Sequence, residues 1–221
     1  MNVESREPSV ESQSQVAPAT SPLLVLISAP SGGGKTTLCQ QLLAARPQMT
    51  RAVTCTTRPP RAGERDGVDY YFLDAGSFLK RVQAGNFLEH ATVYGNCYGI
   101  LKAEVLGKLR QGKDVLLNVD VQGAATIREK AQEDAELKRA LVSVFLTPPS
   151  LGLVEQRLRK RATDSPAVIQ KRLSVARQEI AQWKNFDYLL LSSSIPEDLR
   201  RMLAIVEAEK IRSLRVQAPE F

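Results

Sequence analysis

The sequence has few residues of the kinds that cross-link a protein or bind metals. It contains three cysteines, one histidine and one tryptophan among 221 residues. Cys39, Cys55 and Cys97 are odd in number and have no paired metal-ligand spacing, which argues against a disulfide framework and against a structural zinc site. We therefore expect a reducing, cytoplasmic compartment.

Long apolar runs are also missing. The longest, Leu23–Ile27 and Val115–Leu117, fall far short of the ~20 residues needed to cross a bilayer, so we expect a soluble protein without a membrane partner. Residues 1–22 are rich in Ser, Gln, Pro and Glu, and they lack both the apolar run of a secretory signal and the acid-poor character of a mitochondrial presequence. Such a composition cannot offset the entropy of ordering, which predicts a disordered tail.

The basic residues are concentrated in two short segments. The formal net charge is +6, and arginines cluster at 51–65 and 157–177 rather than along one extended stripe. A stripe or a basic helix would suggest nucleic acid, whereas two compact clusters favour a small polyanion held from two sides. We therefore expect no nucleic-acid partner.

Short apolar segments alternate with helical ones along most of the chain. This alternation is typical of parallel strands that are covered on both faces, and it predicts one folding unit with a doubly wound α/β core. The helix expected at 36–46 ends at Pro47. The strands that we expect in this core are Leu23–Ile27, Val115–Val119, Leu141–Leu146 and Tyr188–Leu191.

Two further segments differ from this core pattern. Between the first helix and the strand at 115, β-prone residues such as Val53–Thr57 and Tyr70–Phe72 predict a small β-rich insertion. Later, Ser165 precedes Pro166, a pair typical of a helix start, and apolar residues follow at helical spacing. This second pattern predicts a lid helix.

A glycine-rich loop follows the first strand and precedes the first helix. Its backbone amides can hold phosphate oxygens, Lys35 would reach the β- and γ-phosphates, and Thr36 would ligate magnesium. The common pattern begins with Gly where this chain has Ala29, and it predicts nucleoside triphosphate binding without identifying the acceptor. The expected ATP contacts are Ala29, Pro30, Ser31, Gly32, Gly33, Gly34, Lys35, Thr36 and Thr37.

A second candidate phosphate site lies in a proline-stiffened loop. Arg58 and Arg61 are three residues apart, and planar guanidinium groups can hold one phosphate through paired hydrogen bonds. Alone, this segment is also compatible with a solvated turn.

Taken with the glycine-rich loop, several motifs resemble the guanylate kinase family in order and spacing, from about Leu23 to about Arg212. The resemblance implies ATP and GMP as substrates, Mg²⁺ as cofactor and a P-loop fold of three parts within 23–221: a core (23–51, 104–147 and 177–212), a GMP-binding part (52–103) and a lid (148–176). The motifs are Ser28–Thr37, Thr54–Glu64, Asp69–Phe72, Phe87–Ala91, Gly95–Gly99 and Asp120–Gly123.

The resemblance also implies individual roles. Glu89 matches the carboxylate that recognises guanine. An ionised carboxylate only accepts hydrogen bonds, so it can accept from both N1–H and N2–H₂ of the base. The alternative is that Glu89 is an exposed glutamate on a helix. Lys35, Arg58, Arg161 and Arg172 match catalytic cations that stabilise the transferring phosphoryl group. Thr36 and, through water, Asp120 would hold Mg²⁺. The implied GMP contacts are Thr54, Arg58, Arg61, Glu64, Tyr70, Glu89, Tyr98 and Asp120.

Five residues depart from the family pattern. Ile100 stands where Ser or Thr usually hydrogen-bonds the base, and Asn118 stands at the first acid of an Asp-x-Asp strand end. Ala162 replaces a common lid glycine, and Ser192-Ser193 replace an Asn-Asp type pair near the adenine. We expect altered affinity or selectivity with an unchanged reaction.

Two other functions fit parts of the same pattern. A kinase of this fold that phosphorylates ribose 1,5-bisphosphate would need the arginines and Lys35 but not Glu89. A non-catalytic guanylate-kinase-like module that binds phosphopeptides would need the arginines but not Gly34-Lys35-Thr36. GMP phosphorylation, with dGMP as a second acceptor, accounts for more of the motifs than either.

Overall fold

The computed structural model describes residues 20–160 and 166–217, and its centre is a parallel sheet. The strand order is β2-β7-β1-β8-β9, and every pairing is parallel. The four expected strands are confirmed to within a residue or two, and the α/β class with them. The strands are β1 (Leu24–Ser28), β2 (Met49–Arg51), β7 (Asp114–Asn118), β8 (Leu141–Thr147) and β9 (Tyr188–Leu191).

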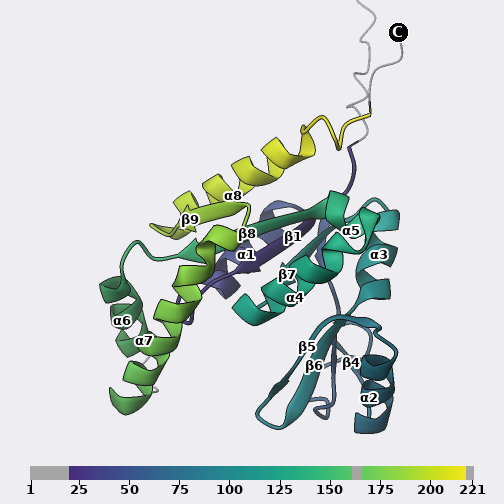
Figure 1. Cartoon of the computed structure of the whole chain (residues 1–221), viewed down its shortest axis with the longest axis horizontal. Coiled ribbons are helices and arrows are strands. Elements are labelled where there is room, and N and C mark those ends of the chain that lie inside the picture. The colour runs from purple at the N-terminus through teal and green to yellow at the C-terminus, as the bar shows by residue number, and fades with distance from the viewer. Residues whose placement is uncertain (1–19, 161–165, 218–221) are drawn as a thin grey trace, which may run out of the picture.

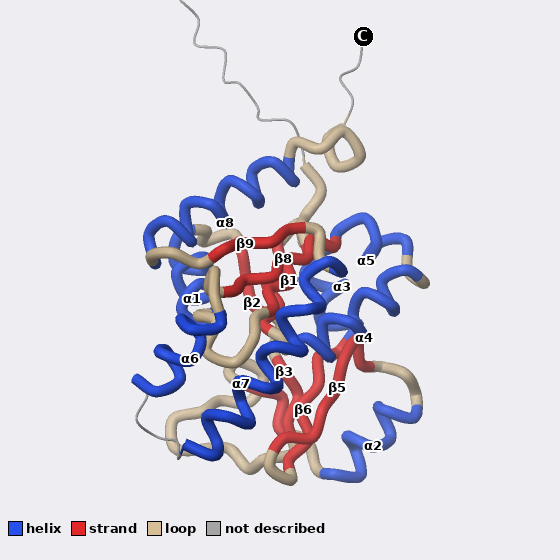
Figure 2. The backbone as a smooth tube through the Cα atoms, turned by 60° about the vertical axis from the view of Figure 1, so that its left-hand side comes forward, coloured by secondary structure: helices blue, strands red, loops and turns tan. Residues whose placement is uncertain are grey.

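Helices cover both faces of this sheet, which explains the uninterrupted apolar strands (Figures 1 and 2). In β1, Leu24 and Leu26 pack with α3, α4 and α5, whereas Val25 and Ile27 pack with α1 and α8. The bounds are α1 (Lys35–Ala45), α3 (Lys102–Arg110), α4 (Val121–Gln132), α5 (Ala135–Ala140) and α8 (Ile195–Lys210).

The insertion at 52–103 forms a second, four-stranded sheet in the order β4-β3-β6-β5. It also contains a helix that the β-prone composition did not predict. Asp74 caps this helix by accepting from the Ser77 amide at 2.8 Å, and Phe78 stacks on Phe87 with ring centroids 4.6 Å apart. The elements are β3 (Thr54–Thr56), β4 (Tyr70–Phe72), α2 (Ala75–Gln83), β5 (Phe87–Val93) and β6 (Asn96–Leu101).

The expected lid consists of two helices, α6 (Leu151–Lys160) and α7 (Pro166–Ile180), followed by the short helix η1 (Ala181–Asn185). The helix start expected at Pro166 is confirmed, and α7 runs past residue 176, where the lid was expected to end. Val154 and Leu158 of α6 pack with Ala176 of α7. The lid pair and the small sheet project from the same side of the large sheet (Figure 1).

The start of the described chain is joined to its C-terminal segment. Thr20 pairs with Val216, and the Ser21 amide donates to the carbonyl of Arg215 at 2.9 Å. Residues 20 and 21, which were expected to belong to the tail, thus have backbone partners in the C-terminal segment; residues 1–19 lie outside the described ranges.

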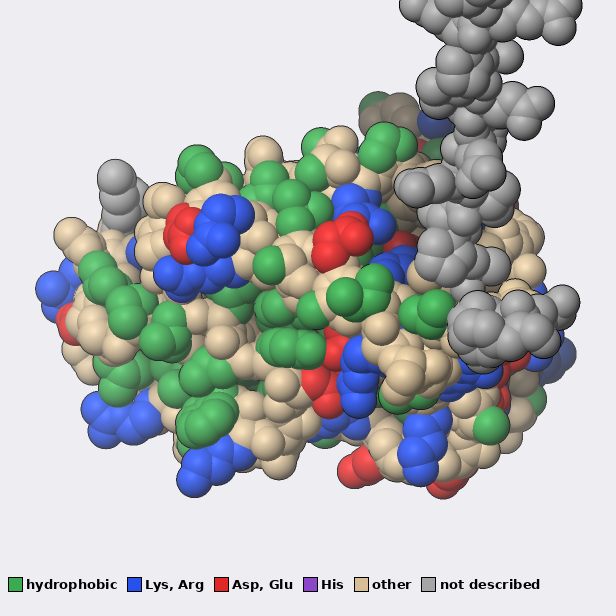
Figure 3. Space-filling model, turned by 90° about the horizontal axis from the view of Figure 1, so that it is seen from above, with side chains coloured by type: hydrophobic (Ala, Val, Ile, Leu, Met, Phe, Trp, Pro, Cys, Tyr) green, Lys and Arg blue, Asp and Glu red, His purple; other side chains and the backbone are tan. Residues whose placement is uncertain are grey.

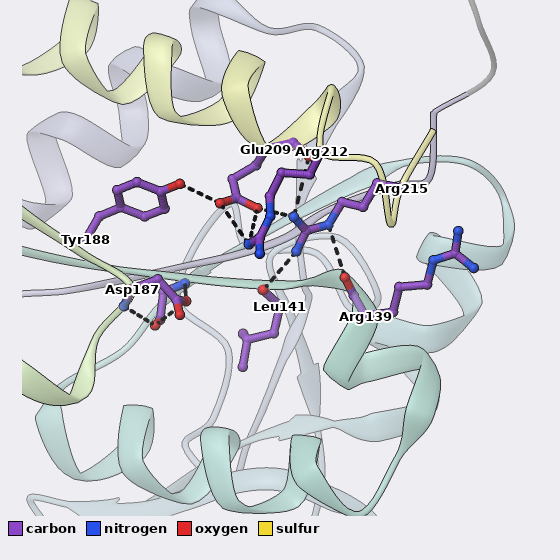
Figure 4. Close-up of polar contacts among 8 residues, drawn as sticks. Arg139, Leu141, Asp187, Tyr188, Glu209, Arg212 and Arg215 are labelled. Carbon is purple, nitrogen blue, oxygen red and sulfur yellow. Dashed lines mark hydrogen bonds and ion pairs between the residues drawn. The ribbon is translucent and has the colours of Figure 1, made fainter. Parts of the chain in front are cut away.

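Figure 4 shows how the C-terminal segment is held. Glu209 and Arg215, 2% and 3% exposed, form a buried ion pair. Tyr188 donates its hydroxyl to Glu209 at 2.5 Å, and Arg215 donates to the carbonyls of Arg139 and Leu141. Each polar group in this cluster has a partner, as burial of charge requires.

On the face that carries α8, basic and acidic side chains lie interspersed among apolar ones (Figure 3). Glu197 of α8, for example, pairs with both Arg200 and Arg201. Within the described ranges, no helix combines the length and the apolar character that spanning a bilayer would require.

Candidate active site

The glycine-rich loop links the end of β1 to the start of α1. Its backbone conformation is unfavourable for residues other than glycine. Gly32 and Gly34 have φ angles of 82° and 97°. A Cβ at Gly33 would lie 2.8 Å from the Cβ of Ala29 and 3.0 Å from the carbonyl oxygen of Pro30. The loop lines a cavity of about 300 Å³ together with Asp120 and Glu179. The position of this loop at the N-terminus of α1 makes the cavity suited to an anion.

Lys35 lies at the first position of α1 and points toward the end of β7. Its Nζ donates to the carbonyl of Val119 at 2.6 Å. Burial lowers the pKa of Lys35, and the carboxylate of Asp120 acts in the opposite direction. An ammonium group in a partly dry cavity gains most from an anionic ligand, which would replace the water that it has lost.

Asp120, at the start of α4, and Thr36, in the first turn of α1, supply oxygen atoms to the same cavity. Asp120 follows β7 and caps α4 by accepting from the Gly123 amide at 2.8 Å. One carboxylate and one exposed hydroxyl fit a magnesium ion that keeps most of its water ligands. In the described part of the chain, no group of three or more acidic, His or Cys side chains is gathered in a way that could hold a metal ion.

Glu89 lies in β5, not in a helix, and is half-buried. Its Oε2 atom is buried and has no hydrogen-bond partner within the described residues. Burial, with a smaller contribution from Asp120, raises the pKa of Glu89 to about 7. A buried carboxylate oxygen without a partner is costly, and a ligand that donates hydrogen bonds would remove that cost.

Thr54, Ile100 and Glu89 form a row across three adjacent strands. Ile100 of β6 is in register with Thr54 of β3 on one side and with Glu89 of β5 on the other. Directly paired residues project from the same face of a sheet. An apolar side chain, 6% exposed, therefore stands between the hydroxyl and the carboxylate.

Two of the departures from the family pattern line one cavity. Ile100 and Asn118 meet there with Thr36 and Thr54, in a space of about 280 Å³ between the large and small sheets. The structure therefore brings the departures at 100 and 118 next to the expected magnesium and acceptor residues.

Arg58 and Glu64 form a paired ion contact in the loop after β3. Arg58 Nη1 and Nη2 lie 3.0 and 2.9 Å from the two carboxylate oxygens, and Glu64 also accepts from the Arg61 amide at 2.7 Å. These hydrogen bonds hold the pKa of Glu64 below its usual range. The Arg58 guanidinium carbon lies 5.3 Å from the Tyr70 ring centroid, and the Tyr70 and Tyr98 centroids are 6.4 Å apart. Glu64 thus fixes the orientation of Arg58 beside both phenols, while Arg61 is exposed.

Of the two expected lid arginines, Arg172 lies on α7, whereas Arg161 lies outside the described residues, as does Ala162. The sequence analysis assigned no site role to Arg157 of α6. Arg157 Nη1 donates to the Gly33 carbonyl at 3.4 Å, and Nη2 donates to Ser192 Oγ at 3.2 Å. Arg157 and Ser192-Ser193 line a cavity of about 470 Å³ against the glycine-rich loop.

Glu179 was also missed. It lies in the last turn of α7, and its Oε2 accepts from the Ser31 amide at 3.3 Å. No local pattern marks either residue, since the contacts of Arg157 and Glu179 join positions 124 and 148 residues apart.

Comparison with known proteins agrees with this geometry. The family model described as guanylate kinase matches residues 21–209. The guanylate kinase of Coxiella burnetii is 42% identical over 189 residues, which are 86% of this chain and 88% of that protein. That of Cereibacter sphaeroides is 43% identical over 190 residues, with coverage of 86% and 88%.

A solved structure supports the same assignment. The crystal structure of guanylate kinase from Anaplasma phagocytophilum matches with a TM-score of 0.66 at 31% identity, covering 90% of this chain and 92% of that one. Because the family model spans most of the chain and the relatives align over nearly their whole length, the chain belongs to the guanylate kinase family.

Proposed function

We propose that this protein transfers the γ-phosphoryl group of ATP to the phosphate of GMP, and of dGMP, giving ADP and GDP or dGDP. The observation that carries this proposal is the buried, unpartnered Oε2 of Glu89. It faces the same region as Asp120 and Lys35, whose charges act on the Glu89 carboxyl group. Guanine offers two adjacent donors to such a carboxylate, whereas adenine presents an acceptor at N1.

The acceptor phosphate would bind at the Arg58 loop. Arg58 is already oriented by Glu64 and lies beside Tyr70, so little side-chain freedom is lost when a phosphate arrives. Arg61 is exposed and can turn toward the same anion. Two guanidinium groups and two phenols suit a phosphate dianion.

The donor would bind at the glycine-rich loop. Lys35 and the loop amides hold the β- and γ-phosphates, and Arg157 borders the loop on the α6 side. Mg²⁺, held by Thr36 and through water by Asp120, would supply positive charge to the phosphate oxygens.

Chemistry then needs positioning rather than a general base. An oxygen of the GMP phosphate attacks the γ-phosphorus, a new P–O bond forms, and the bond to the β–γ bridging oxygen breaks with release of ADP. Lys35, Arg172 and Arg161 would stabilise the charge on the transferred group. Closure of the lid would exclude water, which would otherwise accept the phosphoryl group.

The test is magnesium-dependent ADP production from ATP with GMP, dGMP, AMP, UMP, CMP or ribose 1,5-bisphosphate. We expect turnover with GMP and dGMP only. Lys35→Met should lose this turnover, while its circular dichroism spectrum should match that of the unmodified protein. Turnover with ribose 1,5-bisphosphate alone would select that rival kinase. Inactivity with every acceptor would favour the phosphopeptide-binding module.

We also propose a cytoplasmic location. All three cysteines are free thiols, and burial raises the pKa of Cys39 and of Cys55 to about 11, which suits a compartment without oxidative cross-linking. ATP and GMP are the partners that we assign to the protein.

A further inference from the structure

The glycine-rich loop already contacts an anion that belongs to the protein itself. The Ser31 amide, one of the loop amides expected to face phosphate, donates to the carboxylate of Glu179 at 3.3 Å. Glu179 also lines the loop cavity together with Lys35 and Asp120. A carboxylate therefore lies where phosphate oxygens are expected.

The position of Glu179 is not explained by helix stability. Glu179 is in the last turn of α7, where the helix dipole disfavours negative charge. Burial and the nearby Asp120 carboxylate raise the pKa of Glu179. The helix dipole, burial and Asp120 thus all disfavour a carboxylate at this place. Only the Ser31 amide and Lys35 of the loop region favour it. Residues that break local rules in this way are often functional.

A triphosphate could not enter the loop without affecting this contact. The Ser31 N–H can donate one good hydrogen bond, and a phosphate oxygen would compete for it with Glu179. Carboxylate and phosphate in one partly buried cavity would also repel each other. Lys35 is in a similar state, since its Nζ donates to the Val119 carbonyl at 2.6 Å. Donors at both the start and the end of the loop are therefore satisfied by protein acceptors.

We propose that Glu179 is a positioning residue that holds the phosphate loop before nucleotide binds and is displaced by the phosphates of ATP. Because Glu179 lies in the last turn of α7, its displacement would release this end of the lid helix, which we call the lid base, from the loop. The filling of the donor site is thereby coupled to lid movement.

The rest of the lid base has the contacts that such coupling needs. Helix α6 reaches the same loop, since Arg157 donates to the Gly33 carbonyl at 3.4 Å and a Cβ at Gly32 would lie 3.3 Å from Cδ2 of Leu158. Leu158 in turn packs with Ala176 of α7. The two lid helices are joined to each other, and each contacts the loop.

This inference rests on the proposed binding of ATP at the loop. The test is the affinity of the protein for the magnesium complex of an ATP analogue whose β–γ bond cannot be cleaved. Calorimetry without GMP gives the dissociation constant. Glu179→Ala should bind the analogue more tightly, by about tenfold, the size expected when one competing hydrogen bond to a charged group is removed. Glu179→Gln retains an oxygen acceptor without the charge and should show a smaller gain.

Glu155→Ala is the matched control. Glu155 lies on α6 of the same lid, where it pairs with Arg159, so its removal changes the charge equally without touching the loop. Its affinity for the analogue should equal that of the unmodified protein.

Trp183 provides a readout that separates displacement from simple charge repulsion. It is the only tryptophan, it lies in η1 directly after α7, and it is 40% exposed. The analogue should change Trp183 emission in the unmodified protein, whereas ligand-free Glu179→Ala should already show emission close to that of the bound state.

Each contrary outcome has a distinct meaning. Weaker binding by Glu179→Ala would show that Glu179 supports the loop when it is filled, which overturns the displacement model. Unchanged affinity and emission would make Glu179 a bystander. If the unmodified protein failed to bind the analogue at all, the proposed function would fail with it.

Discussion

Gly123 of α4 stands directly against the side chain of Glu89 in β5. A Cβ at position 123 would lie 3.1 Å from Cγ of Glu89 and 3.3 Å from its Oε1. The glycine costs helix stability, but it lets α4 approach the carboxylate that we assign to guanine recognition. The packing of α4, which covers the large sheet, thus helps to determine the position of the Glu89 side chain in the small sheet.

Gly123→Ala should therefore raise the KM for GMP several-fold while leaving the KM for ATP nearly unchanged. The added methyl group would push Glu89 away from its position, because the three atoms nearest to it would all belong to Glu89 and none to the glycine-rich loop. Steady-state kinetics with each substrate varied in turn measures the effect. Gly107→Ala in α3 is the control, because nothing lies within 4 Å of its Cβ; equal kinetic effects of the two changes would refute the steric argument.

Glu89→Gln should stabilise the fold at pH 8 more than at pH 5. In the folded protein the pKa of Glu89 is raised to about 7 from its ordinary value of 4.5. Below pH 4.5 the carboxyl group is neutral in both states. As the pH rises toward 7, the unfolded form ionises first and the folded state becomes less stable by comparison, up to about 2 kcal/mol for a site that is partly open to solvent.

Urea unfolding of both proteins at pH 5 and pH 8 tests this sign. The gain from Glu89→Gln should be largest at pH 8, where its GMP turnover should also fall furthest below that of the unmodified protein, because Glu89 is then ionised and the glutamine is not. A gain that does not depend on pH would mean that ionisation of Glu89 has no part in it.

Ile100→Thr should lower the KM for GMP. The new hydroxyl would stand between Thr54 and Glu89 in the same row and could hydrogen-bond the base, a gain of about 1 kcal/mol. Comparison of kcat/KM for GMP and AMP measures both affinity and selectivity. Ile100→Val controls for the loss of volume, and if it matched the threonine variant, the missing polar contact would not be the cause.

Arg215→Ala should destabilise the protein by about 3–5 kcal/mol, because it leaves the buried Glu209 carboxylate without its charged partner. Chemical denaturation gives the free energy of unfolding, and the KM values of the surviving folded protein should not change. The exposed pair of Arg200 and Glu197 is the control, and Arg200→Ala should cause a much smaller loss because water screens this pair. A small loss at Arg215 would mean that water reaches the cluster in Figure 4.

Much of the fold could be predicted because the signals are local. Continuous apolar strands and a glycine-rich turn between strand and helix predicted the parallel core and its loop. The three-residue strand β2 and the helix α2 were missed. A signal for α2 was present, since Asp74 is followed at helical spacing by Phe78 and Val82, but the β-prone residues around it outweighed that pattern.

The candidate site divides in the same way. Lys35, Arg58, Glu89 and Asp120 lie in short motifs, so the sequence alone placed them. Arg157, Glu179 and the close approach of Gly123 to Glu89 could not be found in that way, because each depends on a distance between elements that lie far apart along the chain.

By itself, the sequence determined the parallel core, the phosphate loop and the residue types that a nucleotide kinase of this family needs, because periodicity and motif spacing are properties of neighbouring residues. Only the tertiary structure decided that Glu89 is a half-buried strand residue with a raised pKa, that Ile100 separates it from Thr54, and that Glu179 contacts the glycine-rich loop. Burial, register and electrostatic environment arise when distant segments pack together, and no single segment carries them.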